Sequence, residues 1–234
     1  MFLSAYETSP LSSCSIFPSS LQQLDLHDAG RMQTLEPLSN LTSLTRLFLS
    51  QCGEDLISEG LWPLVIQGHL SELCILGSPK FFAASYAMWG WLNGDREQLL
   101  RRHSKLQQVK TDDVTGFLTA PICTVLSTSL TQLRIGSEEL VGFTEAEEEA
   151  LQLLTSLQTL EFSWCPELDC LPAGLCKLPN LKSLQISGCP AISSLPKDGL
   201  PNSLRQLDVQ LGGDELKQQC RNFILDHPGI ELII

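Results

Sequence analysis

The chain has 234 residues, of which 27 are acidic and 15 are basic, and its formal net charge is −12. This charge disfavours nucleic acid and anionic lipid as partners, because both attract basic protein surfaces. Hydrophobic residues make up 43% of the chain, yet no apolar run approaches the ~20 residues of a membrane-spanning helix. The sequence therefore predicts a protein that binds neither nucleic acid nor membranes.

The first segment, 1–20, is rich in Ser and Pro and only weakly periodic. It has no basic start and contains Glu7 and Pro10, so it does not have the form of a secretory signal peptide. Residues 17–20 lead into Leu21 much as residues 200–203 lead into Leu204. We interpret 1–20 as a partial or irregular repeat, and we expect the chain to be a fragment of a longer protein.

Residues 21–211 repeat the pattern Leu-x-x-Leu-x-(Leu/Ile/Phe), or a close variant, eight times at intervals of 23, 26, 36, 24, 27, 24 and 23 residues. Alternate residues of a strand point to opposite faces, so the apolar positions can share one core. A single repeat cannot bury its own leucines, whereas stacked repeats can. This predicts an α/β leucine-rich repeat solenoid, a horseshoe with a parallel sheet on its concave face and irregular or short helical segments on its convex side. The repeats begin at Leu21, Leu44, Leu70, Leu106, Leu130, Leu157, Leu181 and Leu204.

The longest interval contains an insertion, 78–105, with two interpretations. Its aromatic and basic residues either contact a partner protein or pack on the repeats. Large aromatic side chains are usually buried, which favours packing. The residues concerned are Phe81, Phe82, Tyr86, Trp89, Trp91, Arg96, Arg101, Arg102, His103 and Lys105.

Two helices are predicted in the C-terminal half. Thr144 and Glu147 have the spacing of a capping box, which predicts a short convex helix with an acidic first turn. The acidic residues 145–149 form either a docking patch or, as we favour, a solvated helix face. Segment 212–234 is predicted to cap the solenoid with a helix over 214–225 and a last strand within 229–234.

Catalytic and cofactor motifs are not found in the sequence. It contains no phosphate-binding glycine loop, and its four histidines lie far apart without a motif around them. We therefore predict no enzyme activity, no cofactor and no metal. Among the nine cysteines, Cys52, Cys165 and Cys189 share one slot after a strand, which predicts a buried thiol ladder. A zinc site is disfavoured because the spacing lacks Cys-x-x-Cys.

The remaining candidate site is the concave face, which carries the third and fifth residues of each motif. Lys110 and Arg134 are expected about 5 Å apart on adjacent strands, as a small basic spot flanked by Glu161. This face either binds another protein through charge pairing or is simply solvated. The predicted protein-binding residues are Arg46, Phe48, Glu72, Gln108, Lys110, Gln132, Arg134, Thr159, Glu161, Gln185, Gln206 and Asp208.

The repeats at Leu157–Leu175 and Leu181–Leu200 share the form L-x-x-L-x-(I/F)-S-x-C-P-x-(L/I)-x-x-L-P-x-G-L, apart from one extra residue in the second. This form resembles the leucine-rich repeat domain of plant nucleotide-binding leucine-rich repeat immune receptors, above all the coiled-coil class of grasses. The resemblance is sharp over 157–211, good over 21–76 and loose over 78–155. The sequence also lacks the N-x-L-x-G-x-I-P form of extracellular plant repeats.

The resemblance implies a defence receptor in the cytoplasm, or shared between cytoplasm and nucleus. Its partner would be a pathogen effector, a guarded host protein or the receptor's own nucleotide-binding domain. The coiled-coil and nucleotide-binding modules of that family have no counterpart in these 234 residues, so nucleotide binding does not carry over. The alternative interpretation is a substrate-recognition module of a ubiquitin ligase.

Overall fold

The computed structural model describes residues 17–28, 32–67, 69–83 and 104–234. These residues belong to two compact units, Met1–Phe117 and Leu118–Ile234. The aromatic and basic residues predicted for the insertion between residues 84 and 103 lie outside the described residues.

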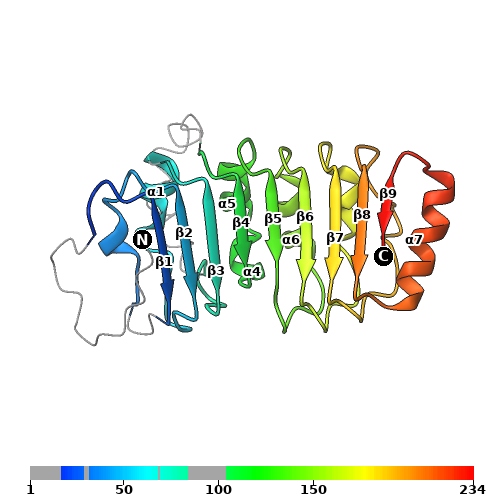
Figure 1. The fold of residues 1–234 in the computed structure, drawn as a ribbon, viewed down its shortest axis with the longest axis horizontal. Helices are drawn as coiled ribbons and strands as arrows, with labels where there is room; N and C mark the ends of the chain where they lie inside the picture. The colour runs from blue at the N-terminus through cyan, green and yellow to red at the C-terminus, as the bar shows by residue number, and fades with distance from the viewer. Residues whose placement is uncertain (1–16, 29–31, 68, 84–103) are drawn as a thin grey trace. The chain divides into compact units, whose positions relative to one another are not determined.

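The described part of the first unit contains four parallel strands that follow one another in chain order (Figure 1). Each strand is formed by one leucine motif, and the strands pair without a shift: Leu24 lies beside Leu47, and Leu47 beside Leu73. The variant fourth motif forms a strand as well, with Val109 beside Leu73. The elements are β1 (Gln23–His27), η1 (Glu36–Leu38), β2 (Arg46–Ser50), α1 (Leu61–Gln67), β3 (Glu72–Leu76), β4 (Gln108–Thr111) and α4 (Val114–Phe117).

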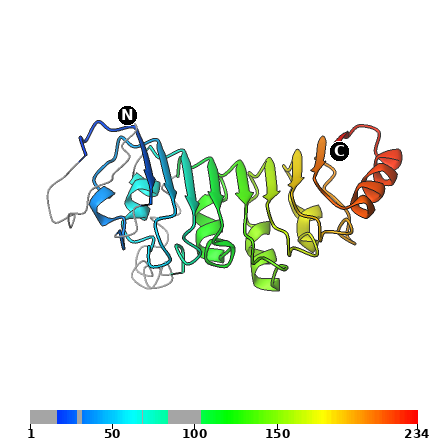
Figure 2. The ribbon, with the colours of Figure 1, turned by 60° about the horizontal axis from the view of Figure 1, so that its bottom comes forward.

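The second unit is built in the same way from five parallel strands, again in chain order. Its helical segments α5, α6 and η2 lie together on one side of these strands (Figure 2). The elements are α5 (Ala120–Leu126), β5 (Gln132–Ile135), α6 (Glu145–Gln152), β6 (Thr159–Ser163), η2 (Ala173–Lys177), β7 (Ser183–Ser187), β8 (Gln206–Gln210), α7 (Asp214–Asp226) and β9 (Glu231–Ile233).

The core of each unit follows from the alternation of side chains along the strands. Leu160, Leu184 and Leu207 pair in register on β6, β7 and β8, and none of the three is exposed to solvent. The predicted leucine-rich repeat solenoid is therefore confirmed within each unit. The opposite side of each sheet carries the third and fifth residues of every motif, and we call it the open face.

The predicted capping box of α6 is confirmed. The Thr144 hydroxyl accepts a hydrogen bond from the backbone N–H of Glu147 at 3.3 Å, and the Glu147 carboxylate accepts one from the backbone N–H of Thr144 at 2.8 Å. In the same acidic run, the Glu148 carboxylate accepts a hydrogen bond from the backbone N–H of Ala173 in the next repeat. Two of the four glutamates between Glu145 and Glu149 therefore stabilise the fold locally.

The start of the insertion is packed, as favoured from the sequence. Phe81 and Phe82 are fully buried, and their rings meet edge to face with centroids 4.8 Å apart. The Phe82 ring also contacts the Phe117 ring of α4, with centroids 5.2 Å apart. Lys105, at the end of the insertion, is exposed. These two aromatics therefore belong to the core of the first unit.

A buried carboxylate fixes the backbone of this segment. Asp113 is 3% exposed, and its side chain accepts hydrogen bonds from the backbone N–H groups of Phe82 and Gly116 at 2.6 and 3.0 Å. Burial raises the pKa of Asp113 from 3.8 to about 6, and the charge of the adjacent Asp112 adds to the rise. The two hydrogen bonds lower this pKa, but burial has the larger effect.

The shifted pKa of Asp113 predicts that its contribution to stability falls as the pH rises. Between pH 4 and pH 6 the folded state holds a proton on Asp113 that the unfolded chain has already lost, so folding is favoured at the acidic end of this window. The full effect is about 3 kcal/mol. We expect the difference in unfolding free energy between wild type and Asp113→Asn to change by about this amount between pH 4 and pH 7. Urea unfolding of both proteins at each pH measures it, and a constant difference contradicts the prediction.

The C-terminal segment forms the helix and the strand predicted for it. Leu216 and Cys220 are the buried residues of α7, and β9 pairs in parallel with β8 so that Leu232 lies beside Leu207. The leucine row thus extends one strand beyond the last complete repeat. Among the described residues, no helix combines the length and the apolar character needed to cross a membrane.

Candidate functional site

All twelve predicted binding positions lie on strands, at the open face of their sheets. Because side chains alternate, each lies next to at least one buried core position of its own strand, as the burial patterns of the strands show. The first unit carries Arg46, Phe48, Glu72, Gln108 and Lys110, and the second carries Gln132, Arg134, Thr159, Glu161, Gln185, Gln206 and Asp208. Their role in binding stays a prediction.

In the described part of the first unit, an ion pair and a ring contact lie on the open face. The Arg46 guanidinium lies 2.6 Å from the Glu72 carboxylate, across the paired strands β2 and β3. The Phe48 ring lies in the centre of β2, and its centroid is 5.2 Å from that of the His27 ring on β1. The His27 Nδ1 is 2.6 Å from the Ser50 hydroxyl. The guanidinium is about half exposed, and ion pairs of this kind contribute at most about 1 kcal/mol.

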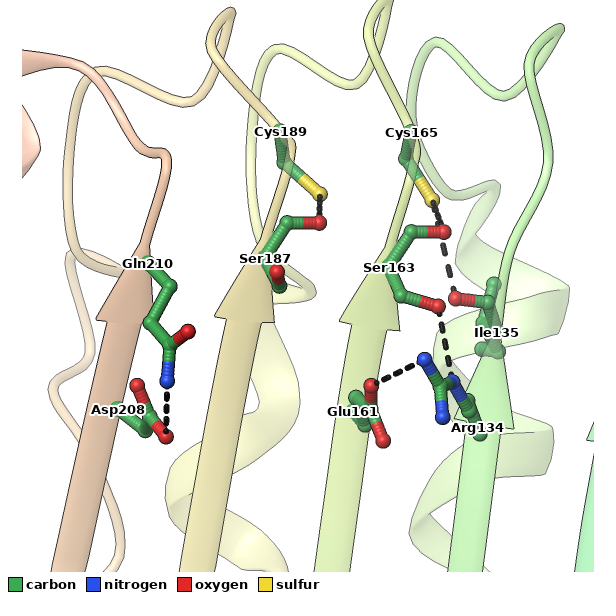
Figure 3. Close-up of polar contacts among 9 residues, drawn as sticks. All are labelled: Arg134, Ile135, Glu161, Ser163, Cys165, Ser187, Cys189, Asp208 and Gln210. Atoms are coloured by element: carbon green, nitrogen blue, oxygen red, sulfur yellow. Dashed lines mark hydrogen bonds and ion pairs between the residues drawn. The ribbon is translucent and has the colours of Figure 1, made fainter.

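In the second unit, Arg134 is held by two partners on the next strand (Figure 3). Its Nη2 atom lies 2.9 Å from the Glu161 carboxylate, and its Nε–H donates to the Ser163 hydroxyl at 3.0 Å. Glu161 was predicted to flank Arg134, and the structure shows that it balances the arginine charge directly. Arg134 by itself is therefore no basic spot. Lys110 lies on β4 of the other unit, so the predicted spacing between Lys110 and Arg134 stays a prediction.

The end of this open face is acidic and incompletely hydrogen-bonded. On β8, one Asp208 oxygen accepts a hydrogen bond from the Gln210 amide at 3.2 Å (Figure 3), whereas the other, Oδ1, is buried without a hydrogen-bond partner among the described residues. Nearby, the Gln206 amide oxygen accepts from the Ser183 hydroxyl at 2.9 Å. A buried carboxylate oxygen without a donor is unfavourable, so Asp208 is poised to accept one.

The predicted thiol ladder is confirmed. Each thiol donates a hydrogen bond to the carbonyl oxygen of the last residue of the preceding strand, at 3.5 Å for Cys52, 3.7 Å for Cys165 and 3.6 Å for Cys189. Figure 3 shows the last two side by side. The adjacent Cys165 thiol, together with burial, raises the pKa of Cys189. These buried thiols are structural, and no His, Cys, Asp and Glu side chains group as a metal site within the described ranges.

The residue that directly follows a strand was not predicted to be a functional position. Several of these residues have positive φ angles, and two of them are large and apolar: Trp164 (φ 58°) and Leu211 (φ 53°). The signal was present in the aligned repeats, where Trp164 stands in the same place as Gly188. A glycine in one copy of a repeat often marks a backbone conformation that the other copies share.

Neither a protein-family model nor a curated protein sequence matches the chain. Solved structures similar to it include the leucine-rich repeat domain of the type III effector XopL, with 17% identity and a TM-score of 0.49 over 86% of this chain and 71% of that one. Another is a leucine-rich repeat protein from Bacteroides eggerthii, with 15% identity and a TM-score of 0.39. That match covers 88% of this chain and 34% of the other protein. The fold is assigned from the chain's own leucine repeats, the register of its strands and its thiol ladder. These features make each unit a leucine-rich repeat solenoid.

Proposed function

We propose that the chain is a non-catalytic protein-binding module that recognises its partner through the open face. The supporting observation is the contrast between the two sides of the strands in the second unit. The core positions repeat leucine at 160, 184 and 207, whereas the open-face neighbours change from Thr159 to Ser183 to Gln206. Recognition can thus be tuned at many open-face positions without disturbing the core.

We further propose that this module belongs to an intracellular plant immune receptor and works in the cytoplasm. The support is the repeat form over 157–211 described above. In this role the partner is a pathogen effector, a guarded host protein or the receptor's own nucleotide-binding domain.

The longest transcript of the gene tests this finer proposal. A nucleotide-binding module encoded in the same reading frame, upstream of these repeats, supports it. An F-box-like helical module in that place contradicts it and favours substrate recognition by a ubiquitin ligase. Neither result bears on whether the open face binds protein, which needs a separate measurement.

Reversing the open-face charges is expected to weaken partner binding at least tenfold while leaving the fold intact. The variant is Lys110→Glu with Arg134→Glu. Because the Arg134–Glu161 pair is partly exposed, its loss should cost about 1 kcal/mol of stability, and the two carboxylates then opposed on β5 and β6 should cost about 1 kcal/mol more. A partner identified by affinity capture would be produced in recombinant form and titrated by calorimetry.

The matched control for this experiment is Lys197→Glu, which reverses an exposed charge away from the strands. We expect the control to bind like the wild type. Equal affinity of the open-face variant and the wild type contradicts binding through these residues, provided that thermal unfolding shows both proteins folded.

A further inference from the structure

The residue that follows β1, β2, β3, β6, β7 or β8 occupies a recurrent left-handed position. In the second unit Trp164, Gly188 and Leu211 follow β6, β7 and β8 with φ angles of 58°, 67° and 53°. In the first unit the same place after β1, β2 and β3 is taken by Asp28, Gln51 and Gly77, with φ angles of 55°, 54° and 70°. The same backbone conformation is thus adopted by polar residues or glycine in the first unit. In the second unit it is adopted by glycine and by two large apolar residues.

Neither local conformation nor packing explains Trp164 and Leu211 at these positions. Left-handed φ angles favour Gly, Asn and Asp, and they disfavour bulky side chains. Packing could compensate for this, but the two residues are 66% and 67% exposed. Strained residues that gain nothing from the core are typical of binding sites.

Trp164, Gly188 and Leu211 form a continuous row across three strands, which we call the apolar row. The backbone N–H of Trp164 donates to the Ser187 carbonyl at 2.9 Å, and that of Gly188 to the Gln210 carbonyl at 3.1 Å. A Cβ atom placed on Gly188 would lie 3.3 Å from the Cε3 atom of the Trp164 indole. The indole therefore lies over Gly188, and glycine leaves the ring room to point along the row toward β8.

Next to the apolar row lies the Asp208 carboxylate of β8, whose hydrogen bonding is incomplete among the described residues. Leu211 directly follows Gln210, whose exposed amide donates to one oxygen of Asp208. The second oxygen has no donor in the part of the chain that the structure describes. The arginine of this open face, Arg134, is already paired with Glu161. The second unit as a whole has fifteen acidic and seven basic residues. The charge that complements this end of the sheet is therefore positive.

We propose that the apolar row and Asp208 together bind a segment of a partner protein in which an arginine adjoins an apolar side chain. The apolar side chain packs between Trp164 and Leu211. The guanidinium takes the place of the Gln210 amide at the Asp208 carboxylate, where its paired N–H groups can donate to both oxygens. Arginine fits better than lysine because its planar group stacks on indole and pairs with carboxylate in a fixed geometry. This inference rests on the proposed protein-binding function and specifies the chemistry of the partner.

The test uses the whole chain and an array of synthetic peptides in three series of equal length and matched flanking residues. One series contains Arg-Leu pairs, the second Glu-Leu pairs and the third Arg-Ser pairs. We expect the wild type to retain the Arg-Leu series at least fivefold more strongly than either of the others. Trp164→Asn should reduce this retention about tenfold, and Asp208→Asn should remove the preference for Arg-Leu over Glu-Leu. Equal retention of all three series overturns the proposal.

Two further measurements separate binding from structure. Asparagine suits a left-handed position, so Trp164→Asn should unfold at the same urea concentration as the wild type or a higher one. A marked loss of stability shows that Trp164 is a packing residue and overturns the proposal. The matched control is Leu225→Ala on α7, which truncates an apolar side chain that is 81% exposed and should retain the Arg-Leu series unchanged.

The failure of this inference can be distinguished from that of the proposed function. If Lys110→Glu with Arg134→Glu weakens partner binding and Trp164→Asn does not, the open face binds protein but the apolar row does not. If the wild type dimerises and Trp164→Asn is monomeric by light scattering, a second copy of the chain occupies the row. That result also overturns the proposed partner.

Discussion

Replacing Gly60 by alanine is expected to destabilise the first unit by more than about 4 kcal/mol. Gly60 directly precedes α1 and has a φ angle of 90°, which side chains rarely adopt. An added Cβ atom would overlap the backbone of Leu35 and Glu36. That backbone cannot easily withdraw, because the Leu35 N–H donates to the Glu59 carbonyl at 2.7 Å.

Gly199→Ala is the matched control for Gly60→Ala. Gly199 has a similar φ angle of 82°, but a Cβ atom there would meet nothing within 4 Å. Its replacement should cost only the backbone strain, about 1–2 kcal/mol. Urea unfolding of both variants measures the difference. Equal losses would show that the close approach at Leu35 and Glu36 has no energetic consequence.

Truncation of Leu184 to alanine should lower the free energy of unfolding by about 3–5 kcal/mol. Leu184 is fully buried between its register partners Leu160 and Leu207. The resulting cavity is bordered on both sides by strands that are fixed by backbone hydrogen bonds, so the site cannot readily collapse. The loss includes both the transfer of the side chain to water and the dispersion contacts left unmade.

The neighbouring residue provides the control for Leu184→Ala. Gln185 lies on the open face of the same strand, and its amide donates a long hydrogen bond of 3.4 Å to the Ser183 hydroxyl. Gln185→Ala should change the free energy of unfolding by less than about 1 kcal/mol. Chemical denaturation followed by circular dichroism compares the two. Similar losses would contradict a continuous core on one side of the strands.

The sequence predicted those features that depend on short periods. Strand positions follow from leucines three and five residues apart, and their pairing follows from the interval between motifs. Even the variant motif containing Val109 forms a regular strand. The capping box at Thr144 and the C-terminal helix were also predictable, because helix ends are specified by a few adjacent residues.

Features that join distant residues could not be predicted. The Asp113 carboxylate accepts a hydrogen bond from the backbone N–H of Phe82, 31 residues earlier. The spacing of these two residues in the sequence does not predict that hydrogen bond. The register placed Glu161 beside Arg134, but rotamers decide whether neighbours pair, and the sequence does not specify them. The Trp164 side chain is exposed at a position where its own backbone has a positive φ angle. The leucine pattern does not predict that backbone conformation.

Pairing without a shift between successive strands has a consequence for how such a gene can change. Each repeat in the second unit begins and ends at equivalent backbone positions, since Thr159 pairs with Ser183 and Ser183 with Gln206. Unequal recombination that duplicates or deletes one such block would rejoin the chain with its leucines still aligned. Diversity can then arise by shuffling whole blocks as well as by point substitution.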